Sequence, residues 1–198
     1  MKSIFVSLRL MVWATLLLGM GYPLLVMVVS QELFPKQANG SLITVQGNVV
    51  GSSLIGQDFS TKPGYFVGRP SATGDHPYNA LASGGSNLTI DGQAFRQGVE
   101  KLRDSWAVQA ARVGETAPVP EALVTASASG LDPDLDLKAA LWEVPILAQS
   151  RHIDPGTLRA LVKSQSVKPV FPWDPPAFVN VLKLNLSLDR IKISSVAK

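Results

Sequence analysis

A long apolar run near the N-terminus constrains the fold of this chain more than any other feature. The segment Leu10–Val29 contains no charged side chain and no carboxamide. At about 1.5 Å of rise per residue, a helix of this length matches the roughly 30 Å thickness of a bilayer's hydrocarbon core. The run therefore predicts a transmembrane helix, which we place at residues 10–30.

The charges on either side of the run predict its orientation. Lys2 and Arg9 precede it, whereas Lys36 is the nearest basic residue after it. Because positive charges are retained on the cytoplasmic side, residues 1–9 are expected in the cytoplasm and residues 31–198 outside the membrane.

A cleaved signal peptide is the alternative interpretation of the same run. Its apolar region normally spans only about 7 to 15 residues and ends in small residues at the cut. The triplet Val28-Val29-Ser30 supplies such a site poorly. An uncleaved, single-pass anchor is therefore the prediction.

The centre of the run has the features of a helix that contacts another helix. Pro23 has no N–H to donate to the carbonyl of Gly19, and its ring crowds that carbonyl, so a kink is expected. Thr15, Gly19 and Tyr22 fall on one face, where small side chains allow close approach in lipid. Together with Pro23 they form a predicted contact face for a partner helix. The alternative is that Gly and Pro are simply commoner in membrane helices.

Composition argues against several classes of function. The formal net charge of +3 includes the two basic residues before the run, and no basic cluster alternates with aromatic residues, so nucleic-acid binding is not expected. The chain has 0 Cys, and its 2 His, His76 and His152, are far apart. It lacks the phosphate-binding loop, the nucleophile elbow and the zinc-binding helix motif. We therefore predict no catalytic site, no metal site and no directly bound cofactor.

The residues after the run predict one mixed α+β domain. β-branched residues on both sides of Gln46-Gly47-Asn48 indicate a hairpin that reaches Ile55. Apolar residues at spacings of three and four then indicate a helix that packs on the core through one face. Three helices are predicted after the hairpin. The first has Asp91 as its N-cap and runs to Gly114, and the second runs from Leu137 to about Ser150, with Asp136 as its cap and Pro145 bending or ending it. The third is short and follows the Asp154-Pro155 cap.

The C-terminal segment Phe178–Leu188 is ambiguous. Its leucines alternate with polar residues, which predicts a half-buried strand that turns helical near Asn185. Val181, Leu184 and Leu188 would equally line one face of a helix.

A stretch without regular periodicity, Gly56–Leu88, is rich in Gly, Ser, Pro and Asn. Such composition usually indicates a flexible linker. Aromatic residues such as Tyr65, Phe66 and Tyr78 interrupt it, so an ordered loop is the better interpretation. We expect this loop to pack on the surface of the domain and to form a binding surface.

Short motifs occur along nearly the whole chain, namely Gly21-Tyr-Pro23, Phe34-Pro35, Gln37–Leu42, Gly51–Gln57, Phe66, Gly68–Ala72, Tyr78-Asn79, Ala82–Leu88, Leu123–Pro133, Val179–Leu182, Leu184-Asn185 and Leu188-Asp189. Taken together and in this order, they resemble the C subunits of bacterial Kdp-type potassium-transporting ATPases. Two segments depart from the pattern, namely Phe171–Pro176 and the tail Ile191–Lys198.

The resemblance implies a non-catalytic subunit in the bacterial inner membrane. Its implied partners are a channel-like potassium-translocating subunit, a P-type ATPase subunit and a very small membrane peptide. C subunits of this family are described as chaperones that raise the ATP affinity of the P-type subunit. Because a domain outside the membrane, in the periplasm, cannot reach cytoplasmic ATP, ATP and potassium are expected to be handled by the complex. An anchored extracytoplasmic enzyme acting on an envelope substrate is the alternative.

The segment Gly68–Leu88 is the predicted docking surface for the potassium-translocating partner. Arg69 lies between Gly68 and Pro70, and its guanidinium offers five donors in a rigid fork suited to carbonyls or a carboxylate. The alternative is that Arg69 caps the backbone of its own domain. The candidate docking residues are Arg69, Ser71, Ser83, Ser86 and Asn87.

Overall fold

The computed structural model describes residues 2–171, 173 and 175–196, and it confirms the mixed helix and strand fold. The chain divides into two compact units, Met1–Ser52 and Ser53–Lys198. The first contains the N-terminal helix, a short helix and a hairpin, and the second contains the later helices and a two-stranded sheet. Of the segments that depart from the family resemblance, residues 172, 174 and 197–198 lie outside the described residues.

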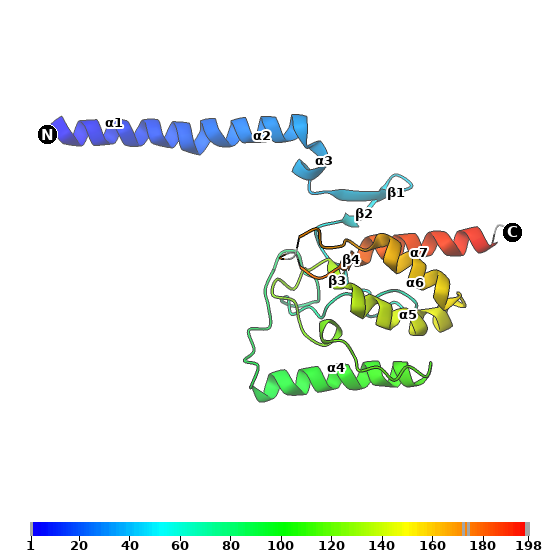
Figure 1. Cartoon of the computed structure of the whole chain (residues 1–198). Coiled ribbons are helices and arrows are strands. Elements are labelled where there is room, and N and C mark those ends of the chain that lie inside the picture. The colour runs from blue at the N-terminus through cyan, green and yellow to red at the C-terminus, as the bar shows by residue number, and fades with distance from the viewer. Residues whose placement is uncertain (1, 172, 174, 197–198) are drawn as a thin grey trace. The chain divides into compact units, whose positions relative to one another are not determined.

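The N-terminal helix runs without interruption from Lys2 to Leu33 and is long and apolar enough to cross a membrane (Figure 1). It consists of α1 (Lys2–Leu16), a π-helical turn η1 (Leu17–Gly21) and α2 (Tyr22–Leu33). The helix begins ahead of the apolar run because no proline or glycine breaks residues 2–9. None of its side chains is buried, so its surface is available to lipid or to another helix.

The irregularity expected near Pro23 takes the form of the π-helical turn. This turn ends at Gly21, two residues before the proline. A widened turn changes the register of the carbonyls that Pro23 would otherwise crowd, which is how a proline fits inside a continuous helix.

The predicted hairpin is confirmed. A short helix α3 (Pro35–Ala38) precedes β1 (Leu42–Val45), which pairs antiparallel with β2 (Asn48–Ser52). The turn residues Gln46 and Gly47 have φ angles of 50° and 82°. Two successive positive φ angles give a two-residue turn whose twist matches the strands. The second strand ends at Ser52, earlier than the predicted Ile55.

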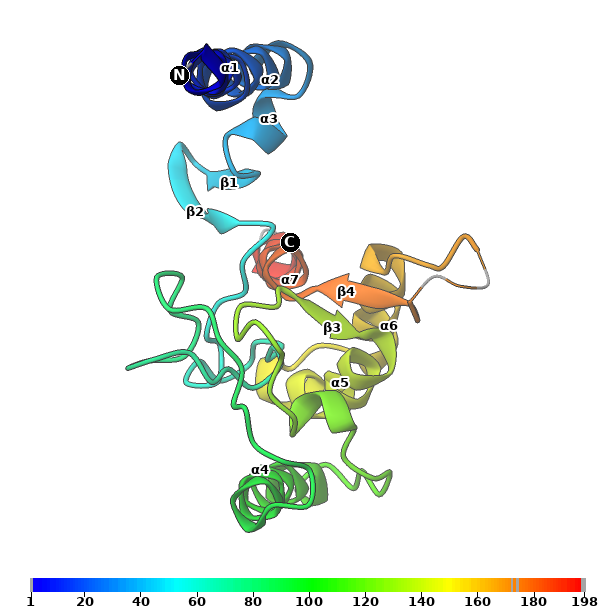
Figure 2. The same ribbon diagram turned by 90° about the vertical axis from the view of Figure 1, so that its left-hand side faces the viewer.

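In the second unit, helices surround a small antiparallel sheet (Figure 2). Its strands are β3 (Asp134–Asp136) and β4 (Phe178–Asn180), with Leu135 opposite Val179. Both of these side chains are buried. The core around them comes mainly from α5 (Leu137–Arg151), α6 (Pro155–Gln165) and α7 (Val181–Val196).

The C-terminal segment becomes helical earlier than predicted. The strand β4 is short, and α7 already begins at Val181, so a strand as far as Asn185 was wrong. Val181, Leu184 and Leu188 are all buried, as the helical alternative required. Burial of this face against α6 outweighs the two-residue alternation of the leucines.

Two helix predictions concern proline. Asp154 caps α6 as predicted, because its Oδ2 accepts a hydrogen bond from the Thr157 N–H at 2.7 Å. Pro145, in contrast, does not end α5, which is continuous from Leu137 to Arg151. The buried face of α5 supplies the packing that offsets the lost backbone hydrogen bond.

The long helix α4 (Gln93–Ala111) matches its prediction only in part. Its N-cap is Gly92, and Asp91 forms an exposed ion pair with Arg96 at 3.7 Å, so the predicted Asp91 cap was wrong. Only Trp106 and Ala110 of its apolar face are buried. In both views α4 lies along one side of the second unit, away from α7 (Figures 1 and 2).

The segment from Ser53 to Gly92 contains no helix or strand among its described residues, yet it is tied to the core. Phe66 is fully buried and Phe59 nearly so. The loop is therefore held on the core by the aromatic residues that interrupt it. Its aromatic side chains supply the apolar area that its small residues lack.

Candidate functional site

Two buried polar side chains hold the loop segment Gly64–Val67 against the helices. The Asn185 amide, from α7, accepts from the Phe66 N–H and donates to the Phe66 carbonyl, both at 2.9 Å. The Glu143 carboxyl, from α5, accepts from the Val67 N–H at 3.0 Å through Oε2. These contacts satisfy buried backbone groups that a strand would otherwise have to pair.

An ion pair strengthens the same attachment. The Arg151 Nη1 lies 2.9 Å from Asp189 Oδ1, and Arg151 also donates to the Gly64 carbonyl. The guanidinium stacks 4.2 Å from the centre of the Tyr65 ring, whose hydroxyl lies 3.1 Å from Asp189 Oδ2. The Arg151 side chain is only 9% exposed, whereas Asp189 is 41% exposed, so the cluster lies at the edge of the packed interior.

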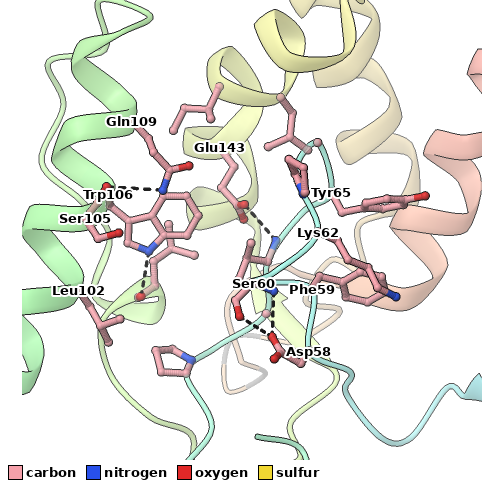
Figure 3. A pocket seen from close by; sticks show the side chains of 18 of the residues that line it. Asp58, Phe59, Ser60, Lys62, Tyr65, Leu102, Ser105, Trp106, Gln109 and Glu143 are labelled. Atoms are coloured by element: carbon pink, nitrogen blue, oxygen red, sulfur yellow. Dashed lines mark hydrogen bonds between the residues drawn. The ribbon is translucent and has the colours of Figure 1, made fainter.

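A cavity of about 520 Å³ lies between this loop, α4 and α5 (Figure 3). Trp106 forms one wall, and it packs edge to face on Trp142 with ring centres 5.8 Å apart. Phe59 and Tyr65 contribute aromatic surface from the loop. The cavity persists because α4 contacts the rest of the unit mainly near its C-terminal end, where its buried residues lie.

Glu143 is the most unusual residue in the cavity lining. It is fully buried, and Figure 3 shows its carboxyl reaching from α5 into the space between α4 and the loop. Its Oε1 has no hydrogen-bond partner among the described residues. Burial raises the pKa of Glu143 well above its ordinary value, and the Val67 N–H opposes this only in part.

The candidate docking residue Arg69 is engaged inside its own unit. Its Nη2 donates to the Ala126 carbonyl at 3.3 Å, and its Nη1 lies 3.5 Å from Asp132 Oδ2. About a third of each side chain in this pair remains exposed. The contact with a backbone carbonyl is the kind of cap that the alternative interpretation described.

Ser71 organises the turn that follows Arg69. Its hydroxyl donates to the Gly130 carbonyl at 2.7 Å and accepts from the Tyr78 N–H at 2.8 Å. The Tyr78 hydroxyl in turn donates to the Arg69 carbonyl. A Cβ on Gly68 would collide with that hydroxyl, so the close approach requires glycine at this position.

Two stretches rich in small residues, Ala82–Leu88 and Leu123–Pro133, lie side by side. Ser83 donates to the Ser129 carbonyl at 3.0 Å, and the same carbonyl accepts from the Gly84 N–H at 2.9 Å. Gly130 has a φ of 66°, and a Cβ there would meet Thr73 and the Gly84 carbonyl. Small residues therefore allow the two backbones to touch.

Beyond these contacts the predicted docking segment is exposed. Ser83, Ser86 and Asn87 are all at the surface. Leu81 is 98% exposed, and Leu88 and Ile90 are exposed apolar neighbours. The structure therefore separates the five candidates by exposure: Arg69 and Ser71 are half-buried, and the other three are exposed polar residues beside apolar side chains. Ser83 is exposed although it also bonds within the fold.

The predicted helix face is also exposed. Thr15, Gly19 and Tyr22 all lie at the surface of the N-terminal helix, and Pro23 follows the π-helical turn. A Cβ added to Gly19 would have the Thr15 methyl carbon as its nearest atom, at 3.9 Å. The face therefore has room for another helix to approach closely.

Sequence reasoning missed Glu143 and Asn185. Glu143 is a lone polar residue in an otherwise apolar stretch, and that isolation is the signal that could have found it, whereas Asn185 is one of several polar residues that alternate with leucines and carries no such signal. No group of three or more His, Cys, Asp or Glu side chains that could hold a metal occurs within the described part of the chain.

Comparison with known proteins identifies the family. The family model described as "K+-transporting ATPase, c chain" matches residues 4–190, ending immediately before the divergent tail. The Potassium-transporting ATPase KdpC subunit of Pectobacterium atrosepticum is 47% identical over 194 residues, which cover 97% of this chain and 98% of the relative. The proteins of the same name from Polaromonas naphthalenivorans and Escherichia coli are 51% and 42% identical, over 90% and 96% of this chain and 89% and 99% of their own lengths.

An apolar helix followed by a mixed helix and strand domain, with these relatives, defines a subunit of an ATP-driven potassium transporter. The chain belongs to the family of KdpC subunits of potassium-transporting ATPases. The family does not favour the alternative of an anchored enzyme with an envelope substrate.

Proposed function

We propose that this chain is a non-catalytic accessory subunit that stabilises a potassium-transporting ATPase complex. The observation that carries the proposal is the match to the c chain family over residues 4–190. The proposed partners are a channel-like potassium-translocating subunit, a P-type ATPase subunit and a small membrane peptide. ATP and potassium are handled by those partners, and an effect on ATP affinity is transmitted through them.

The N-terminal helix is the proposed membrane anchor, crossing the bacterial inner membrane once. Lys2 and Arg9 hold the N-terminus in the cytoplasm, and residues 31–198 lie in the periplasm. The absence of buried side chains on this helix supports a role in contacting lipid and partner helices. Its contact face is Thr15, Gly19, Tyr22 and Pro23.

The Gly68–Leu88 segment is the proposed docking surface of the second unit. Arg69 and Ser71 hold its backbone in shape from within the fold. Ser83, Ser86 and Asn87 meet the potassium-translocating partner together with Leu81. Exposed apolar side chains next to satisfied, rigid backbone favour association because little conformational entropy is lost on binding.

Purification of the tagged full chain from native membranes in mild detergent tests this proposal. We expect the other transporter subunits to purify with it in fixed proportion. Recovery of the protein alone, with hydrolase activity on an envelope substrate, would instead support an anchored enzyme.

A further inference from the structure

The cavity lined by α4, α5 and the loop Asp58–Tyr78 has the size and surface of a ligand site. Its volume of about 520 Å³ lies within the range of small-molecule pockets, roughly 300 to 1,000 Å³. Trp106, Phe59 and Leu147 give it apolar walls. The cavity opens to solvent, since Ser60, Lys62 and Arg112 in its lining are exposed.

Two buried polar side-chain atoms, which belong to residues that line the cavity, lack partners. They are Glu143 Oε1 and Arg69 Nε, and they are the buried side-chain atoms without a hydrogen bond in the described part of the chain. The Arg69 Nε–H is always a donor. A neutral Glu143 whose Oε2 accepts from Val67 presents Oε1–H as a second donor. Both atoms therefore need an acceptor oxygen.

The charges of the lining favour the same ligand chemistry. The basic residues of the lining are Lys62, Arg69 and Arg112, and its acidic residues are Asp58 and the buried Glu143. Arg69 already forms an ion pair with Asp132 at 3.5 Å. Asp58 is already bonded to Ser60, through the N–H at 2.9 Å and the hydroxyl at 2.6 Å. The lining is thus richer in cations and free donors than in acceptors, which favours an anionic ligand with oxygen acceptors.

We propose that this cavity binds a small organic acid, with an aromatic or aliphatic body against Trp106 and a carboxylate that accepts from Glu143 and Arg69. The apolar walls hold the body of the ligand, and the carboxylate satisfies both donors. The cavity belongs entirely to the second unit, so the site does not depend on how the two units are arranged.

The proposal is tested with 4-(4-fluorophenyl)butyrate, observed by fluorine NMR with the full chain in lipid nanodiscs. Empty nanodiscs measure partition into lipid, and 4-(4-fluorophenyl)butylamine is the matched compound with a donor in place of the acceptor. We expect the acid to bind about tenfold more tightly than the amine, as expected when two buried donors gain a partner. Equal affinity for acid and amine, or binding no stronger than in empty nanodiscs, would overturn the proposal.

Covalent modification of the cavity wall tests whether the acid binds in the cavity. The chain has no cysteine, so Ser105→Cys on the α4 wall can be modified with benzyl methanethiosulfonate after folding, when no step of folding is perturbed. We expect the modified variant to lose at least about tenfold in affinity for the acid. Ser164→Cys, on the exposed side of α6, is the matched control and should bind as the wild type. Undiminished binding to modified Ser105→Cys would put the ligand elsewhere and refute the site.

Discussion

Replacing Glu143 with glutamine should stabilise the protein at neutral pH and remove part of its pH dependence. The substitution keeps the shape of the side chain, and the amide oxygen can still accept from the Val67 N–H, 3.0 Å from the carboxyl in the wild type. What changes is the ability to ionise. In the wild type, burial raises the pKa of Glu143 in the folded state, whereas in the unfolded chain it is about 4.3.

The sign of the effect follows from proton binding. Below about pH 4.3 the folded and unfolded states are both protonated, and the contribution of Glu143 is fully present. Above that pH the unfolded state releases the proton and the folded state retains it. The free energy of unfolding therefore falls by about 1.4 kcal/mol per pH unit until the pH reaches the raised pKa of Glu143, and then levels off. Two pH units above the start of this window, the free energy of unfolding has fallen by about 2.7 kcal/mol.

Glutamine does not ionise, so the free energy of unfolding of the variant should exceed that of the wild type by an amount that increases as the pH rises. The comparison isolates Glu143 because Asp134, whose pKa is also raised by burial, is present in both proteins. Tyr78 is common to both as well, and burial raises its pKa to about 12, outside the window. Glu100→Gln on the exposed face of α4 is the matched control, and its difference from wild type should not vary with pH.

The assay is guanidinium unfolding of the full chain in detergent micelles, between about pH 5 and pH 8. Tryptophan fluorescence reports on the second unit because Trp106 and Trp142 pack against each other there. A difference between Glu143→Gln and wild type that stays constant across this range would refute a neutral, buried Glu143. A difference that grows with pH in both variants would show a general effect of removing negative charge.

Three further predictions concern topology and assembly. Leu81→Cys, in a chain without cysteine and at a side chain that is 98% exposed, should react with a membrane-impermeant maleimide in intact spheroplasts; labelling only after lysis would place the domain in the cytoplasm. Gly19→Leu should weaken the free energy of helix association by about 1 to 2 kcal/mol and reduce co-purification of the partner subunits, without blocking membrane insertion. Unchanged recovery of the partners would leave the second unit as the sole contact with them. Arg69→Ala should lower the free energy of unfolding by about 1 kcal/mol, since its ion pair with Asp132 is partly exposed, and should weaken assembly. Normal stability with lost assembly would make Arg69 a direct contact with the partner. Normal stability with normal assembly would remove Arg69 from the docking surface.

Local rules were sufficient for the parts of this protein that depend on nearby residues. The apolar run forms a continuous helix because each backbone group bonds within the run itself. The hairpin follows from Gln46 and Gly47, which adopt the positive φ angles that a two-residue turn needs. The Asp154-Pro155 pair starts a helix because the carboxylate accepts a backbone N–H one turn on. The family, too, was recognisable from short motifs spread along the chain.

Tertiary packing decided the rest. Pro145 lies inside a continuous helix because the burial of α5 offsets one missing hydrogen bond.

The candidate site shows the same division most clearly. Gly56–Leu88 could be recognised as an ordered segment from the aromatic residues that interrupt it, but the contacts that support it could not be predicted. Asn185 and Glu143, far away in sequence, bond to the backbone of Phe66 and Val67, and the buried Phe66 anchors the loop in the core. Only the fold brings these residues together, because periodicity describes which face of an element is apolar and contains no information on what that face meets.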